Sequence, residues 1–356
     1  MGRGEWSTAA EVLCVRLDTI GDVLMTGPAL RALRSSGSRP RITLLTSGPG
    51  AAAGGLMPEV DETLVYEAPW MKRDGAHSGG ADDRAMVEAL RQRRFDAAAI
   101  FTVYSQSPLP AALMCQLADV PLRLAHCREN PYRLLTDHVP EPEPQDQLRH
   151  EVRRQLDLVA TVGATTPDER LFVTVPQAER VRVHGLLAEL GIDEGRPWAV
   201  VHPGASAPSR RYPAESWAEA CRLLARDHRV QIVMTGDSSE ATLAAAIQSR
   251  AGVPDRSLAG KVSLGALAAL LEAAPVLLAG NTGPVHLAAS VGTAVVDLYA
   301  LTNPQHTPWG VPSRVLFEDV PCRWCHRSIC PEGHHRCLRE VPPDEVVTAA
   351  LSLLSS

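Results

Sequence analysis

The sequence contains no run of 18 or more apolar residues, so it lacks the ordinary signal of a membrane-spanning helix. Its first residues, MGRGEWSTAAEV, have neither the basic start nor the apolar centre of a signal peptide. We therefore expect a cytoplasmic protein with no transmembrane segment. Peripheral attachment to the inner face of the membrane stays open.

Lysine is also scarce. It occurs only at Lys72 and Lys261, arginine far outnumbers it, and the formal net charge of the 356 residues is -6. A negatively charged chain is a poor partner for nucleic acid or for an anionic membrane surface, although local basic sites remain compatible with it. These features favour a small anionic ligand over nucleic acid. At this length, two α/β domains are expected.

The eight cysteines fall into two groups. Four stand singly among apolar neighbours, as small buried hydrophobic residues do: Cys14, Cys115, Cys127 and Cys221. The other four are closely spaced near the end of the chain, with three histidines interspersed: Cys322, Cys325, Cys330 and Cys337, with His326, His334 and His335. Their spacing suits a tetrahedral structural zinc and, less well, an iron–sulfur cluster. Disulfides and free thiols are the alternatives.

Apolar runs with strand character alternate with helical patterns in the first half of the chain. Strands are predicted at residues 12–17, 41–46, 62–66 and 96–102, and helices at 21–33, 83–94, 109–118 and 148–162. Residues 68–83 are polar and contain glycine, which predicts a surface loop. This alternation is typical of an open, mostly parallel sheet.

The same alternation restarts after the turn at residues 191–197. Strands are predicted at residues 198–202, 230–235, 276–279 and 295–299, and helices at 178–190, 214–226, 239–250, 264–273 and after Pro284. We therefore predict an α/β protein with two doubly wound, Rossmann-like domains facing a cleft, at residues 1–176 and 177–342. The last segment, residues 343–356, is expected to form an amphipathic helix from 343 to 354 that packs across the domains and closes the structure. Ligands of such sheets bind at the carboxyl ends of the strands.

The stretch VLLAGNTGPVHLAAS, residues 276–290, reads as a buried strand, a tight turn and a helix. Pro284 suits a first helical turn, and the backbone N–H groups of Thr282, Gly283 and Val285 would lie at the positive end of the helix dipole. This turn is a candidate anion cradle for a diphosphate, to which His286 could add a hydrogen bond. Because many α/β proteins have such turns, the spacing alone does not decide the matter.

Three further motifs follow predicted strands: RLDTIGDVLMTGPALRAL at 16–33, HPGASAPSRRYPAESWAEA at 202–220 and MTGDSSEATL at 234–243. Together with GNTGPVHLAA, in this order and spacing, they resemble the bacterial heptosyltransferases, the family 9 glycosyltransferases of the GT-B fold. The resemblance spans nearly the whole chain. None of the four motifs would be specific alone.

The resemblance implies that Asp22 is the general base that takes the proton from the acceptor hydroxyl, with Thr19 and Gly21 beside it on the acceptor side. Without the resemblance, an Asp after Gly at a helix start is equally well explained as an N-cap. Asp18 is a nearby carboxylate to which we assign no family role.

On the donor side, Arg210 stands where family members usually carry Lys, and it would stabilise the negative charge that develops on the departing nucleotide diphosphate. Glu240 matches the acidic residue that holds the ribose hydroxyls, and Gly204 belongs to the glycine-containing turn that precedes Arg210. Arg211 reads as a solvated neighbour of Arg210, and from the sequence alone Glu240 would be an exposed residue at a helix start. Asn281 replaces the usual Asp, which loses a charge and leaves the identity of the donor sugar open.

The resemblance implies an inverting transferase that needs no metal or other cofactor for catalysis. A structural zinc in the cysteine cluster is a candidate from the cysteine spacing. The donor would be a nucleotide-diphosphate sugar, ADP-heptose by resemblance, and the acceptor a glycan, glycolipid or small glycoside. The N-terminal half would hold the acceptor and the C-terminal half the donor. A GT-B-shaped nucleotide-sugar epimerase and a non-catalytic nucleotide-sugar binder are the alternatives.

Overall fold

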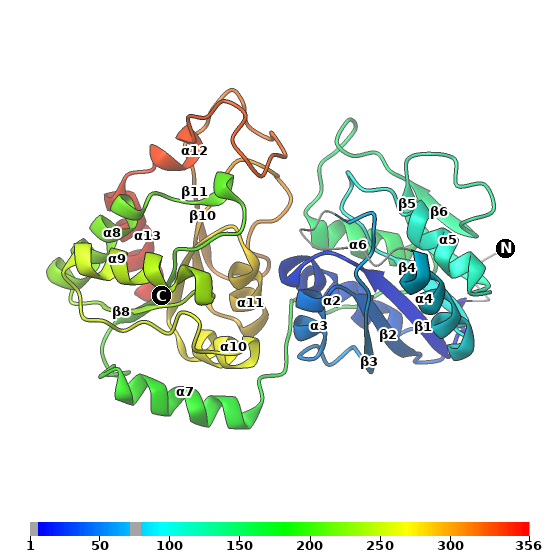
Figure 1. The fold of residues 1–356 in the computed structure, drawn as a ribbon, viewed down its shortest axis with the longest axis horizontal. Coiled ribbons are helices and arrows are strands. Elements are labelled where there is room, and N and C mark those ends of the chain that lie inside the picture. Colours follow the sequence, from blue (N-terminus) through cyan, green and yellow to red (C-terminus); the bar gives the residue numbers. More distant parts are fainter. Residues whose placement is uncertain (1–5, 72–79, 356) are drawn as a thin grey trace. The chain divides into compact units, whose positions relative to one another are not determined.

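A computed structural model describes residues 6–71 and 80–355. The chain forms two compact units, Met1–Phe172 and Val173–Ser356, so the division lies slightly before the boundary at residue 176 expected from the sequence (Figure 1). Within the described residues, no helix is both long enough and apolar enough to cross a membrane.

The first unit contains a six-stranded, fully parallel sheet of order β3-β2-β1-β4-β5-β6. Its strands are β1 Glu11–Arg16, β2 Arg41–Thr46, β3 Glu62–Val65, β4 Ala97–Ile100, β5 Leu122–Cys127 and β6 Asp137–Pro140. Helices α2 (Ile20–Arg34), α3 (Gly48–Gly54) and α6 (Glu151–Ala160) pack together on one face. Helices α4 (Gly80–Arg93) and α5 (Leu109–Leu117) cover the other face, over a separate apolar core.

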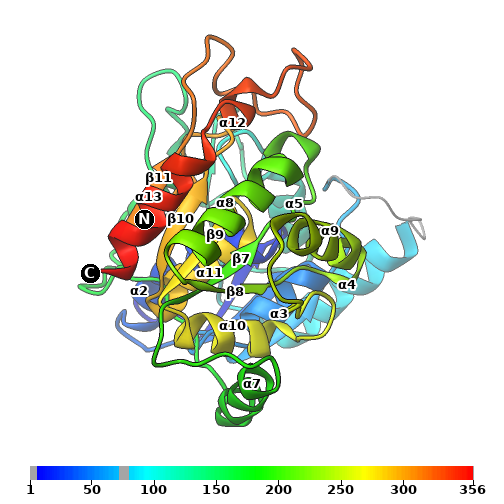
Figure 2. The same cartoon turned by 90° about the vertical axis from the view of Figure 1, so that its left-hand side faces the viewer.

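The second unit repeats this plan with five parallel strands in the order β11-β10-β9-β7-β8. They are β7 Trp198–His202, β8 Gln231–Met234, β9 Val276–Gly280, β10 Ala294–Leu298 and β11 Ser313–Leu316. One face carries α8 (Ala214–Asp227), α9 (Ala241–Ala251) and α13 (Pro343–Leu354). The other carries α7 (Gln177–Glu189), α10 (Leu264–Ala273) and α11 (Gly283–Val291) (Figure 2). A short helix, α12, spans Arg336–Arg339.

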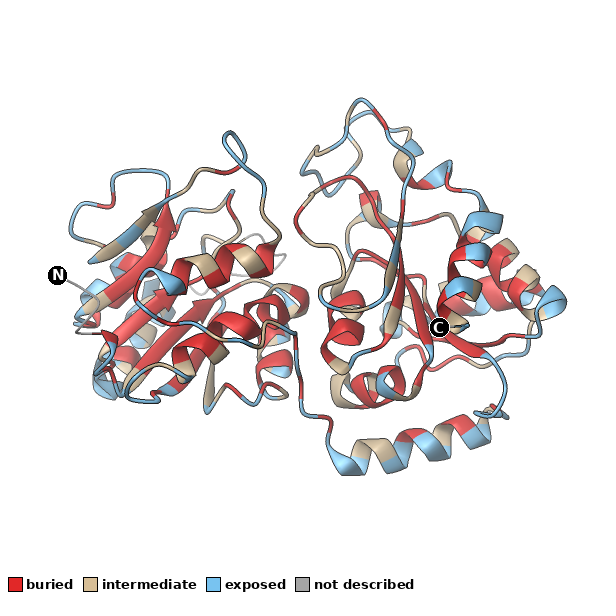
Figure 3. Cartoon of the chain, turned by 180° about the vertical axis from the view of Figure 1, so that it is seen from behind, coloured by how far each residue is buried: buried red, intermediate tan, exposed pale blue. Residues whose placement is uncertain are grey.

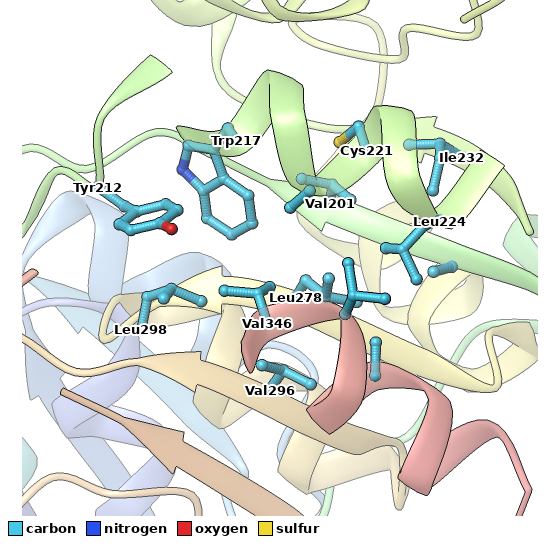
Figure 4. Close-up of a cluster of buried hydrophobic side chains, with 14 of the residues drawn as sticks. Val201, Tyr212, Trp217, Cys221, Leu224, Ile232, Leu278, Val296, Leu298 and Val346 are labelled. Carbon is cyan, nitrogen blue, oxygen red and sulfur yellow. The ribbon is translucent and has the colours of Figure 1, made fainter. Parts of the chain in front are cut away.

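Buried residues concentrate in the strands and in the helix faces that touch them (Figure 3). In the second unit, Tyr212 and Trp217 meet edge to face with their ring centroids 5.3 Å apart, and the Tyr212 hydroxyl donates to the carbonyl of Val341 at 2.8 Å. Val346 of α13 lies in the same cluster (Figure 4). Edge-to-face aromatic pairs add stabilisation beyond the area that they bury.

Helix α13 corrects one expectation. The sequence predicts that it packs across the domains, but its apolar residues lie in the core of the second unit, in contact with α8 and strands β9 to β11. Its apolar face is a single stripe, and α8 and the sheet of the second unit cover that stripe.

Among the described residues, five strands and α-helices were not predicted from the sequence: β5, β6, β11, α3 and α12. Strand β5 contains Arg123 and His126, both buried, which break its apolar pattern. The Arg123 side chain donates to backbone carbonyls of nearby loops, among them those of Leu134 and Arg133, so a charged residue fits inside this strand. Strands β6 and β11 are short edge strands with partly exposed residues.

Each sheet has one point where its connections reverse direction. In the first unit the chain turns one way after β1, through α2 to β2, and the other way after β4, through α5 to β5. In the second unit the corresponding strands are β7 and β9. Because crevices outside the carboxyl ends of such strand pairs are the usual ligand sites of doubly wound sheets, these two points are where candidate residues should gather.

Candidate functional site

The turn from β1 into α2 carries the acceptor-side candidates. Thr19 is the N-cap residue, with extended backbone and no capping bond from its side chain. Asp22 is therefore not the N-cap that the alternative interpretation requires, because it lies in the first turn, two residues after Ile20. Gly21, which precedes Asp22, is buried. The Thr19 hydroxyl donates to Oδ2 of Asp22 at 3.3 Å.

A fully buried guanidinium fixes the carboxylate of Asp22. Arg16, the last residue of β1, has 0% of its side chain exposed and places Nη2 3.1 Å from Oδ1 of Asp22. Its Nε lies 2.9 Å from Oδ2 of Asp18, and its Nη1 donates to Oε1 of Glu151 at 2.7 Å. One planar cation thus holds carboxylates from the strand end, the helix start and α6. The contact between Arg16 and Glu151 could not be predicted from the sequence, because 135 positions separate the two residues.

Burial and charge act together on these groups. Burial alone would lower the pKa of Arg16, but the surrounding carboxylates raise it above its ordinary value, so Arg16 stays protonated. Burial raises the pKa of Asp18 to about 6, with Arg16 opposing that rise. The Asp22 side chain remains 18% exposed, more than that of Asp18 or Glu151. Of the three carboxylates, Asp22 is therefore the most accessible to a substrate.

In the second unit, Gly204 and Glu240 come together after β7 and β8. A Cβ atom at Gly204 would collide with the carboxylate of Glu240, so this position requires glycine for a steric reason. Glu240 accepts from the backbone N–H of Asp237 at 2.9 Å, and Asp237 accepts from the N–H of Glu240 at 3.1 Å, which makes a capping box. Only 16% of the Glu240 side chain is exposed, so it is not the solvated residue that the sequence alone suggested.

His202, the last residue of β7, lies behind Glu240. Its Nε2 is 3.8 Å from Oε2 of Glu240, and its Nδ1 is 3.1 Å from the Thr235 hydroxyl. Burial lowers the pKa of His202 to about 4, so the ring is neutral near pH 7 and forms no ion pair with Glu240 there. Burial also raises the pKa of Glu240. Because the neutral ring of His202 forms no ion pair with it, the Glu240 carboxylate keeps capacity to accept hydrogen bonds from a ligand.

Arg210 connects the two loops at the second reversal point. It ends a short 3-10 helix, Pro208–Arg210, and its Nη1 donates to the carbonyl of Asn281 at 3.3 Å. A Cβ at Gly280 would lie 3.0 Å from the carbonyl oxygen of Arg210, so Gly280 allows this backbone approach. Neither Gly280 nor Gly283 has a positive φ, so the turn does not depend on unusual backbone angles. The neighbouring Arg211 is exposed and donates to the carbonyl of Ala205 at 2.8 Å.

The start of α11 differs in one respect from the predicted anion cradle. Thr282 is the N-cap, Gly283 begins the helix, and the N–H of Val285 already donates to the carbonyl of Thr282 at 3.1 Å. Val285 is thus removed from the predicted donor set, because the first turn uses its N–H. His286 is buried, and its ring stands edge-on to that of His306, with centroids 6.4 Å apart.

Asp297 on β10 was not anticipated by the sequence analysis. It is fully buried, and neither carboxylate oxygen has a hydrogen-bond partner among the described residues. Burial raises its pKa well above the ordinary range, while the charge of Arg210 acts in the opposite direction. The Oδ1 of buried Asn281 likewise has no partner in the described structure. Such side chains mark a place where ligand or water would supply hydrogen bonds.

A cavity of about 550 Å³ lies at the segments that follow β7 and β8. Gly204, Arg211, Asp237 and Glu240 line it, together with His335 and Arg339 from the end of the cysteine-rich segment. Its size and mixed polar lining are appropriate for a nucleotide-sized ligand. The sequence analysis did not associate the cysteine-rich segment with this cavity.

The described side chains of the cysteine cluster are not gathered around a single point. All eight cysteines are free thiols, and among the described residues no group of three or more His, Cys, Asp or Glu side chains is placed to hold a metal ion. The Sγ of Cys322 lies 3.6 Å from Nε2 of His334. Burial raises the pKa of Cys337, and the other three cysteines of the cluster add to the rise. A structural zinc would require these side chains to move toward one another.

Comparison with known proteins gives a consistent result. The profile of the family "Glycosyltransferase family 9 (heptosyltransferase)" matches residues 84–335. Lipopolysaccharide heptosyltransferase 2 of Salmonella typhimurium is 24% identical, over 97% of this chain and 99% of that protein. A family 9 glycosyl transferase from Veillonella parvula has a TM-score of 0.82 at 20% identity, covering 97% of each chain. Escherichia coli ADP-heptose lps heptosyltransferase II has a TM-score of 0.75 at 23% identity, covering 97% of this chain and 98% of that one. The fold of this chain is thus that of solved family 9 enzymes.

We expect Arg16→Met to lower the free energy of unfolding by about 3 to 5 kcal/mol, because it leaves buried carboxylates without their cation. Denaturant unfolding measures the change. Arg41→Met is the matched control, since Arg41 is 53% exposed and 3.5 Å from Glu62, and it should cost less than about 1 kcal/mol. Adding Glu151→Gln to Arg16→Met should recover part of the loss. Equal effects of Arg16→Met and Arg41→Met would contradict this account.

Proposed function

Because the chain belongs to glycosyltransferase family 9, we propose that it transfers a heptose from ADP-heptose to a hydroxyl group of an acceptor, with inversion at the anomeric carbon. The observation that carries the proposal is the partly exposed carboxylate of Asp22, fixed by buried Arg16 at the reversal point of the first sheet. The acceptor would be a glycan, a glycolipid or a small glycoside. The names of the similar proteins support lipopolysaccharide as the acceptor class and ADP-heptose as the donor.

Asp22 would act as the general base. It accepts the proton of the acceptor hydroxyl while that oxygen attacks the anomeric carbon and the bond to the diphosphate oxygen breaks, so ADP leaves with the electron pair. Arg16 and the Thr19 hydroxyl support this role, because both hold the carboxylate in one orientation. A positioned base of this kind contributes about 100- to 10,000-fold to the rate.

Arg210 would stabilise the departing diphosphate. Its guanidinium is always charged and can bind phosphate oxygens through two parallel hydrogen bonds, and the start of α11 adds backbone N–H groups and a helix dipole. Because this cation supplies the charge that a divalent metal supplies in other transferases, we propose that catalysis needs no metal. Glu240 would accept from the ribose hydroxyls, with Gly204 lining the same cavity.

The two units would divide the work. The first would hold the acceptor and the second the donor, since Asp22 lies in the first unit and Arg210 and Glu240 lie in the second. We also propose that the reaction takes place in the cytoplasm. A lipid-linked acceptor would bring the enzyme to the inner face of the membrane.

We predict that Asp22→Asn lowers the rate of transfer about 100- to 10,000-fold while ADP binds normally. Asparagine keeps one oxygen that can accept from Arg16, and its NH2 group can donate to the hydroxyl oxygen of Thr19, so the melting temperature should change little. The measurement is release of ADP and formation of the glycosylated acceptor. Asp168→Asn is the control, because Asp168 is 39% exposed and pairs with Arg170, and it should leave transfer unchanged. A residual rate within about tenfold of wild type would remove Asp22 from the role of base.

We predict that Glu240→Gln weakens ADP binding about 10- to 100-fold, since hydrogen bonds to charged groups contribute about 1.5 to 3 kcal/mol. Glutamine can still accept from the N–H of Asp237, whereas alanine would also break the capping box. Calorimetry with ADP and 2',3'-dideoxy-ADP measures the effect. The variant should bind both nucleotides equally, while wild type prefers ADP. Glu219→Gln, on the exposed side of α8, is the matched control. A variant that still discriminates as wild type does would exclude Glu240 from ribose binding.

We predict that the cysteine cluster has no part in the chemical step. Elemental analysis of the purified protein should show either about one zinc per chain, whose removal lowers the melting temperature, or no metal. In both cases turnover per folded molecule should survive a chelator. Loss of turnover at unchanged melting temperature and unchanged circular dichroism would make a metal catalytic and overturn the prediction.

A further inference from the structure

A second cavity, of about 280 Å³, lies within the first unit at the reversal point of its sheet. The ends of β1 and β4 form its floor and α5 one of its walls, over the apolar core on that face. Its lining includes Trp70, Met71, Phe101, Asp18, Gln106 and Ser105. The volume is just below the range of about 300 to 1,000 Å³ found for drug-sized ligands, so the cavity suits a single small ring.

Asp18 and Gln106 form a polar pair in this lining. The Nε2 of Gln106 donates to Oδ1 of Asp18 at 2.7 Å, and the backbone N–H of Val103 donates to Oε1 of Gln106 at 3.3 Å. A carboxylate has about four lone-pair sites and a primary amide has two N–H donors. The pair therefore retains an acceptor and a donor side by side, which matches two neighbouring hydroxyl groups.

The apolar part of the lining complements the polar pair. The ring of Trp70 is only half-buried and packs at an angle to that of Tyr66, with centroids 5.8 Å apart. A sugar ring has a C–H face that lies well on an aromatic surface and hydroxyl edges that seek planar polar groups. The combination of Trp70 with Asp18 and Gln106 fits such a ring better than it fits a wholly apolar ligand.

The charge of the cavity lining further limits the kinds of ligand that can bind. Among its described lining residues, Asp18 is the one that carries a charge, and the side chain is 10% exposed. The cation behind it, Arg16, is fully buried and already engaged by Asp22 and Glu151 as well. A phosphate or carboxylate group on the bound ring would therefore face a carboxylate, and like charges at close range disfavour binding.

We propose that this cavity binds an uncharged sugar ring of the acceptor, with Asp18 and Gln106 as the groups that select hydroxyls and Trp70 as the surface on which the ring lies. The inference rests on the proposed function, in which the first unit holds the acceptor. The guanidinium of Arg16 holds both Asp18, which lines the cavity, and Asp22, the proposed base, so one cation joins the two carboxylates. Asp18 is thus a residue that determines acceptor specificity.

The test is saturation-transfer NMR on the full chain without donor, using methyl glycosides of mannose, glucose, galactose and heptose, with the uronic acid and 6-phosphate counterparts of the hexosides. We expect at least one neutral glycoside to bind, with the strongest transfer to its ring C–H protons, and its anionic counterpart to bind at least tenfold more weakly. Asp18→Asn should weaken binding of the neutral glycoside at least fivefold. It should also reduce the difference in affinity between the neutral glycoside and its anionic counterpart.

Gln106→Met is the second variant, for the case in which Asp18→Asn does not fold, because it leaves the contacts of Arg16 intact. It should weaken binding of the neutral glycoside by a similar factor. Asp119→Asn, at a side chain 77% exposed, is the control and should change nothing. The proposal is overturned if no neutral glycoside binds while ADP does, or if an anionic counterpart binds as tightly as the neutral one. If the proposed function is wrong, the result is different: the protein binds neither ADP nor ADP-heptose, whether or not it binds a glycoside.

Discussion

The buried guanidinium of Arg16 is the interaction on which the first unit depends. It emerges from the end of β1 with 0% exposure and contacts carboxylates of the following turn, of α2 and of α6. Three acids this close would repel one another without the cation, and the cation would be costly to bury without the acids. Because well-packed apolar residues could fill the same space at least as stably, stability does not explain this network. Its consequence is positional, since it fixes Asp22 relative to the sheet.

In the second unit, steric constraints at two glycines fix the positions of the functional groups. Gly204 lies against the carboxylate of Glu240, and Gly280 lies against the backbone of Arg210. In both places a Cβ atom would occupy the space that a functional group requires, so the absence of a side chain sets the geometry. The glycines at positions 204 and 280 therefore act by allowing another group to approach closely.

The sequence predicted what depends on local pattern. Helix α10 and helix α13 begin and end where the periodicity indicates, and the candidate residues after β1, β7, β8 and β9 lie at the carboxyl ends of their strands. Contacts between distant positions were not predictable. The Arg16–Glu151 ion pair spans 135 residues, and β5 was hidden because Arg123 is satisfied by loop carbonyls that only the tertiary fold supplies. The alternative that Asp22 is the N-cap of α2 is excluded, because Thr19 holds that position three residues earlier.

Asn281 acquires a physical meaning beside Arg210 and Asp297. An aspartate at position 281 would add a negative charge where the guanidinium of Arg210 already contacts the backbone. With an amide there instead, the carboxylate that the charge of Arg210 acts on is that of Asp297, whose burial favours its neutral form. The positive charge of Arg210 is then less compensated by the protein, and an anion arriving at the start of α11 meets a stronger field. The substitution that leaves the donor sugar open therefore strengthens the case for the diphosphate.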